Sequence, residues 1–135
     1  MRHPLHPALV HFPVACWSLA AGTDFASLWL GEPAWRWSAG LLSVGCVIAV
    51  LAMLAGMIEL ARVPDGPALH DTYLHMGIML TAFVLFTARL LLRLDHLEPL
   101  APDTLSLVLD GLGFVALAAG GWVGGKLVYG HGIGR

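Results

Sequence analysis

The sequence carries little charge. Asp, Glu, Lys and Arg together make up 12% of its 135 residues, about half the share of a typical soluble domain. Hydrophobic residues make up 58%, and the mean hydropathy is +0.78. This composition predicts an integral membrane protein with a lipid bilayer as its solvent. Each crossing of the hydrocarbon needs about 20 residues, so the length allows about four spans in a single transmembrane domain, residues 1–135.

Basic runs and closely spaced cysteines are also missing. The seven Lys and Arg residues are scattered and the formal net charge is −2, so nucleic acid is not an expected partner. Cys16 and Cys46 lie in different apolar segments, without the CxxCH motif of covalently attached haem. No phosphate-binding loop or hydrolase elbow is present. We therefore expect an electron carrier or binding protein rather than a catalyst on its own.

Four apolar segments alternate with turns rich in proline and glycine. They predict helices at about 8–30, 37–60, 71–93 and 105–129. Backbone polar groups in lipid must be satisfied within each segment, which requires helices. Short connections make sequential helices antiparallel. The predicted fold is an all-α, up-down-up-down four-helix bundle with both termini on the same side of the membrane. Four of the seven basic residues fall on that side, a small bias toward a cytoplasmic position.

Small and polar residues form stripes at helical spacing. The stripes are His11, Ala15, Ser18 and Gly22 in the first helix, Gly45, Ala49, Ala52, Gly56 and Glu59 in the second, and Asp110, Gly113, Gly120, Gly124 and His131 in the fourth. Small residues at this spacing let membrane helices approach closely. We expect these stripes to face protein. Plain helix packing, contact with a flat cofactor and a homodimer interface all remain open.

Polar side chains within the spans are candidates for function. Arg89 and Arg93 are expected to reach the membrane surface or to pair with Asp24 or Asp110. The five tryptophans include several near predicted helix ends, which is typical of anchoring at the membrane interface.

Histidines are concentrated at one end of the predicted bundle. Six of the seven fall on the termini side: His3, His6, His11, His70, His75 and His131. His11 lies ~5 Å inside the first helix and His75 ~6 Å inside the third, so their depths match. The first and third helices are diagonal in such a bundle, where cofactor sites are built. We predict haem b with His11 and His75 as axial ligands and an electron-transfer role.

Other residues complete this predicted site. Gly120 and Gly124 are expected against the porphyrin, and Lys126, His131, Arg62 and His6 near its propionates. The alternative is a non-haem metal-binding or transport protein that holds zinc, iron or copper, with His70, His131 or Glu59 as further ligands. A third reading is a structural subunit that binds a larger membrane complex through its glycine faces. The histidines would then have no cofactor and would only bridge helices through hydrogen bonds. A redox partner protein or a homodimer would fit these readings.

Both ends of the chain carry recognisable motifs. Residues 3–13, HPLHPALVHFP, and residues 120–132, GGWVGGKLVYGHG, resemble a bacterial family of small inner-membrane proteins catalogued as domain of unknown function 2231. The resemblance implies four hydrophobic segments in this order and a multi-pass position in the cell inner membrane. It assigns His3, His6, His11 and His131 to family motifs, with His75 or His70 as the histidine of the third helix. Some relatives join this module to iron–sulfur or cytochrome-type domains, which implies redox work.

Overall fold

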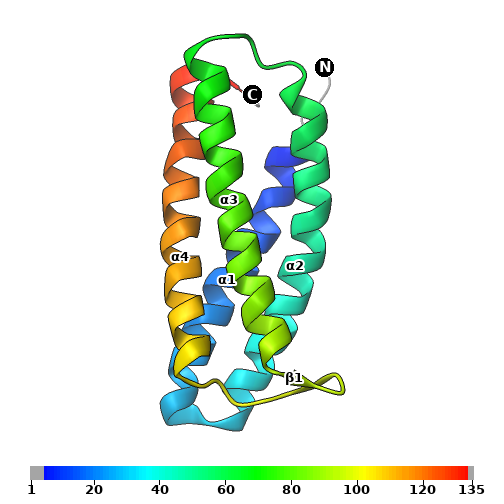
Figure 1. Ribbon diagram of the computed structural model, residues 1–135, viewed down its shortest axis with the longest axis vertical. Coiled ribbons are helices and arrows are strands. Elements are labelled where there is room, and N and C mark those ends of the chain that lie inside the picture. The colour runs from blue at the N-terminus through cyan, green and yellow to red at the C-terminus, as the bar shows by residue number, and fades with distance from the viewer. Residues whose placement is uncertain (1–4, 134–135) are drawn as a thin grey trace.

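The computed structural model describes residues 5–133 and is an all-α bundle, as predicted. Its helices are α1 (Leu5–Leu30), α2 (Glu32–Leu60), α3 (Pro67–Leu92) and α4 (Thr104–Gly125), the last continued by the π-helical turn η1 (Lys126–Gly130). Sequential helices run in opposite directions, so α1 begins and η1 ends at the same end of the bundle (Figure 1). We call this the termini end.

Three segments are long and apolar enough to cross a membrane: α2, α3, and α4 together with η1. Helix α1 is 26 residues long and contains His6, His11 and Asp24. Its crossing, and hence the full count of four spans, stays a prediction.

Helices α2 and α3 begin clearly earlier than the sequence pattern predicts, and α1 begins at Leu5 rather than near 8. Helix α2 starts at Glu32 rather than near 37, and α3 starts at Pro67 rather than near 71. Each has a proline in its first two positions. A backbone N–H at these positions has no acceptor within the helix, so proline, which lacks it, costs no hydrogen bond there. Gly31 and Gly66 precede them at φ 71° and 113°, which glycine adopts without strain. These prolines therefore start helices as well as separate them.

The connection between α3 and α4 holds a small β-hairpin that the sequence analysis missed. Strand β1 (Leu94–Asp95) pairs with β2 (Glu98–Pro99) in antiparallel fashion. His96 and Leu97 form its turn with positive φ angles, a conformation typical of two-residue hairpin turns. Only two residues pair on each strand, too few to leave an alternating pattern in the sequence.

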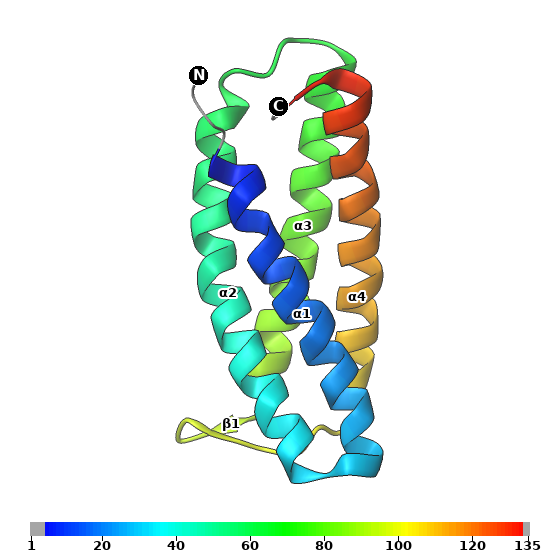
Figure 2. The same cartoon turned by 180° about the vertical axis from the view of Figure 1, so that it is seen from behind.

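The bundle consists of two equivalent helical hairpins. Helix α1 packs mainly along α2, and α3 mainly along α4; Figure 2 shows α1 crossing in front of α3 near mid-height. Buried positions recur in register between them, in the pairs Pro13 and Ala82, Trp17 and Phe86, Ser38 and Ser106, Leu42 and Asp110, Gly45 and Gly113, Ala49 and Leu117, Ala52 and Gly120. Because α1 and α3 run in the same direction, the hairpins are related by an approximate two-fold axis along the bundle.

The buried face of α1 differs from the predicted stripe. His11, Ala15 and Gly22 are exposed, whereas Trp17 and Asp24 are buried. The prediction followed small residues, but here a large aromatic fills the space between the hairpins. Trp17 is thus a core residue, not an interfacial anchor. Other tryptophans, including Trp29, Trp37 and Trp122, are exposed, as expected of side chains facing lipid or its interface.

Candidate histidine site between the hairpins

His6 of α1 and His75 of α3 lie next to each other near the termini end. Their ring centroids are 6.4 Å apart and their planes meet at 87°. Each histidine belongs to a different hairpin, and the two occupy equivalent positions in the repeat. The site therefore lies across the approximate two-fold axis.

Both rings are held by the same kind of hydrogen bond. His6 Nδ1 lies 2.7 Å from the Ala52 carbonyl oxygen, and His75 Nδ1 lies 2.9 Å from the Gly120 carbonyl oxygen. A carbonyl oxygen only accepts hydrogen bonds, so each Nδ1 carries the hydrogen and donates. In a neutral ring this leaves Nε2 with a free lone pair. Within residues 5–133, neither Nε2 atom has a hydrogen-bond partner.

A glycine makes room for each imidazole. A Cβ added at Gly56 would lie 3.0 Å from His6 Nδ1, and one at Gly124 would lie 3.1 Å from His75 Cε1. Gly120 is likewise in contact with Met79. Gly120 and Gly124, which were expected to lie against a porphyrin, are instead in contact with Met79 and His75 of α3. In both hairpins a glycine of the second helix lies against the histidine of the first.

His11, the predicted partner of His75, is not at this site. It lies five residues after His6, which turns its side chain by roughly 140° around the helix, and it is exposed. The expectation that His11 faces inward is therefore wrong. His6, which the sequence analysis placed near the propionates, occupies the facing position instead. Aligning the two hairpins on their buried positions would have matched His6 with His75.

A second polar cluster lies at the termini end. Asp71 Oδ2 accepts hydrogen bonds from Lys126 Nζ and His131 Nε2, each at 2.8 Å. These two predicted site residues are therefore joined to α3 through one carboxylate. Glu59 Oε1 accepts a hydrogen bond from the His6 backbone N–H at 3.2 Å, so this carboxylate is close to the histidine site.

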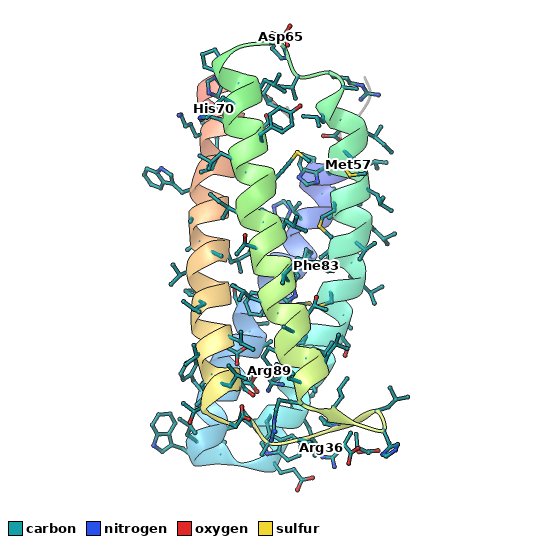
Figure 3. All side chains as sticks on the ribbon, in the orientation of Figure 1. Arg36, Met57, Asp65, His70, Phe83 and Arg89 are labelled. Carbon is teal, nitrogen blue, oxygen red and sulfur yellow. The ribbon has the colours of Figure 1, made fainter. Side chains whose placement is uncertain are left out.

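The remaining predicted ligands are not brought together. His70 is exposed at the start of α3 (Figure 3), and His3 lies outside the described residues. Across residues 5–133 no group of three or more His, Cys, Asp or Glu side chains is arranged to hold a metal ion. The histidine site of the described chain thus offers two protein nitrogens.

A buried ionic cluster occupies the opposite half of the bundle, where the Arg89 side chain lies inside (Figure 3). Arg89 Nε donates to Asp24 Oδ2 at 2.7 Å and lies 3.7 Å from Asp110 Oδ2. The predicted pairing of Arg89 is confirmed. Arg93 pairs instead with Asp103, at 3.5 Å.

These features define a class of protein: a membrane helix bundle of two equivalent hairpins, each of which contributes one histidine to the central axis. The chain belongs to the family described as Predicted membrane protein (DUF2231), whose model matches residues 2–135. The family resemblance seen at the two ends of the sequence is therefore confirmed. No curated protein and no solved structure matches the chain.

Proposed function

We propose that the protein binds haem b between its two hairpins and carries electrons, with His6 and His75 as the axial ligands. One observation carries this proposal: two imidazoles, one from each hairpin, lie with their ring centroids 6.4 Å apart and their planes nearly perpendicular, and each has its Nδ1 hydrogen-bonded to a backbone carbonyl.

The distance between the two ring centroids fits two imidazoles that bind one metal ion. A metal about 2 Å from the nitrogen of each of two imidazoles places the ring centroids roughly 6 Å apart. Perpendicular ring planes are compatible with this, because each ring can take any rotation about its own metal–nitrogen bond. A porphyrin supplies four nitrogen ligands, so two protein nitrogens complete an octahedral iron. His6 and His75 would provide these two nitrogens.

The hydrogen bonds to Ala52 and Gly120 are the contacts expected around a ligating histidine. A backbone carbonyl that accepts from Nδ1 fixes the tautomer, orients the ring and raises the basicity of Nε2. Both acceptors belong to long helices, so the two rings are held by the rigid parts of the fold.

The chemistry that haem supplies when bound is a one-electron change at iron. The chain's own contribution is to hold two imidazoles at fixed positions and to surround them with apolar helices. Lys126 and His131 lie at the same end, where they can donate hydrogen bonds to an anionic propionate as well as to Asp71. An electron carrier also needs a donor and an acceptor, so a redox partner protein is part of the proposal.

The test is to purify the full chain from haem-replete cells and to measure its visible absorption, haem content and metal content. The proposal expects one haem per chain and a spectrum that changes on reduction, typical of two-histidine ligation. Stoichiometric zinc, iron or copper without porphyrin would show a bare metal site instead. Absence of both, including after reconstitution with haem, would leave only a structural role for the histidines.

A further inference from the structure

The ionic cluster of Asp24, Arg89 and Asp110 contains two acids and one base, all sealed inside the protein. Asp24 and Asp110 are 0% exposed and Arg89 is 1% exposed. They come from α1, α4 and α3, so the cluster, like the histidine site, joins the two hairpins.

The two carboxylates are not equally satisfied. Asp24 Oδ2 accepts a hydrogen bond from Arg89 Nε at 2.7 Å, the distance of a charge-assisted hydrogen bond. Asp110 approaches the same Nε only to 3.7 Å, too far for a hydrogen bond, and both its oxygens are buried without a hydrogen-bond partner among the described residues. Arg89 therefore hydrogen-bonds Asp24 and not Asp110, although Asp24 Oδ1 and Arg89 Nη2 are also buried without a hydrogen-bond partner among the described residues.

The number of charges in the cluster bears on its protonation state. With both acids ionised, the cluster holds one uncompensated negative charge away from water, which is strongly disfavoured. The charged group nearest Asp110 is Arg89 from α3, at 3.7 Å, and Asp24 from α1 pairs with the same guanidinium. From α2 the equivalent position is the apolar Leu42, and the described residues of that helix place no charged contact on Asp110.

We propose that Asp24, Arg89 and Asp110 form a proton-binding site inside the bundle, and that Asp110 carries the proton at neutral pH. Two carboxylates that share one environment cannot both ionise easily, so the less well partnered one keeps its proton. The ligand of this site is a single proton. The inference does not depend on haem, because it uses only the residues of this cluster.

Infrared difference spectroscopy of the full chain in lipid nanodiscs tests the proposal. A protonated carboxylic acid has a carbonyl stretching band that a carboxylate lacks, and the band shifts in D₂O. We expect one such band at pH 7 in the natural protein and its loss in Asp110→Asn. Asp103→Asn, which alters a carboxylate outside the bundle core, is the matched control and should retain the band.

The Asp24→Asn variant tests why Asp110 keeps its proton: because Asp24 competes with it for Arg89, or only because Asp110 is buried. With Asp24 neutral, Asp110 can ionise and pair with Arg89, so the proposal expects this variant to lose the band although Asp110 is still present. Persistence of the band in Asp24→Asn would overturn the shared site. No acid band in the natural protein, or one that disappears when sodium replaces potassium, would overturn proton binding; in the second case the ligand would be a metal cation. Circular dichroism of each variant checks that it has folded.

Discussion

Trp17 and Phe86 occupy equivalent positions in the two hairpins and stack against each other at the centre of the bundle. Their ring centroids are 5.1 Å apart and their planes are inclined by 18°. Each ring also lies against a glycine of its own hairpin, Gly45 for Trp17 and Gly113 for Phe86. The contact thus fixes the level at which the hairpins cross. The histidine pair lies on one side of it along the bundle and the ionic cluster on the other.

Adding a methyl group at the glycine behind Phe86 should loosen this crossing. A Cβ at Gly113 would lie 2.9 Å from Phe86 Cζ, so Gly113→Ala must displace the ring. Overpacking costs about 1–3 kcal/mol, partly offset by the better helix propensity of Ala, about 1 kcal/mol. We expect a net loss of roughly 1 kcal/mol in detergent unfolding. Gly111→Ala on the same helix meets nothing within 4 Å and should be neutral or stabilising; equal losses in both variants would contradict the packing argument.

Removing the shared guanidinium should be far more damaging than removing an exposed one. Arg89→Met leaves Asp24 buried without its donor, and breaking a buried pair in this way typically costs about 3–5 kcal/mol. Arg36→Met removes an exposed partner of Glu32 and should change stability little. Thermal unfolding of the two variants in the same detergent compares them directly. Similar midpoints would argue against a buried ionic cluster.

The start of α4 should make stability depend on acid. Asp103 accepts hydrogen bonds from Ser106 N and Oγ at 2.9 and 2.7 Å, which lower the pKa of this carboxyl from its usual 3.8. A group whose pKa is lower in the folded state contributes stability above its unfolded pKa and loses it as pH falls through the folded value. Asp103→Asn retains a capping side chain but cannot titrate. Between about pH 5 and 2 its stability should fall less than that of the natural protein; parallel curves would refute this.

Thiol labelling in intact cells tests whether α1 crosses the membrane. With Cys16 and Cys46 replaced, single cysteines report the two ends of the bundle: one at Asp65, at the termini end (Figure 3), and one at His96, in the turn between β1 and β2 at the opposite end (Figure 1). Four crossings predict that Asp65→Cys lies on the same side as a C-terminal tag and His96→Cys on the opposite side. An N-terminal tag should then be found with Asp65→Cys. If it is found with His96→Cys instead, α1 does not span the bilayer.

The fold was accessible from sequence because length, apolar segments and turn residues are local signals. Residues 31–33 and 64–67 mark the helix boundaries to within a few positions. Boundaries shifted where proline starts a helix, since the same residue type also ends one.

The candidate site was only partly accessible, because helix rotation is not a local signal. The stripe through His11 was read from small residues, but the burial of Trp17 sets the rotation of α1. That burial depends on Phe86 in the other hairpin, which no pattern within α1 encodes. His75 was placed inward correctly, because the glycines of α4 mark the face that receives it.

The most direct test of the account is the reduced-minus-oxidised visible spectrum of four matched proteins: the natural chain and its His6→Ala, His75→Ala and His11→Ala variants, all purified from haem-replete cells. The account predicts a haem spectrum in the natural protein and in His11→Ala, and loss or conversion of that spectrum in both His6→Ala and His75→Ala. A spectrum that survives in His6→Ala and is lost in His11→Ala would contradict it.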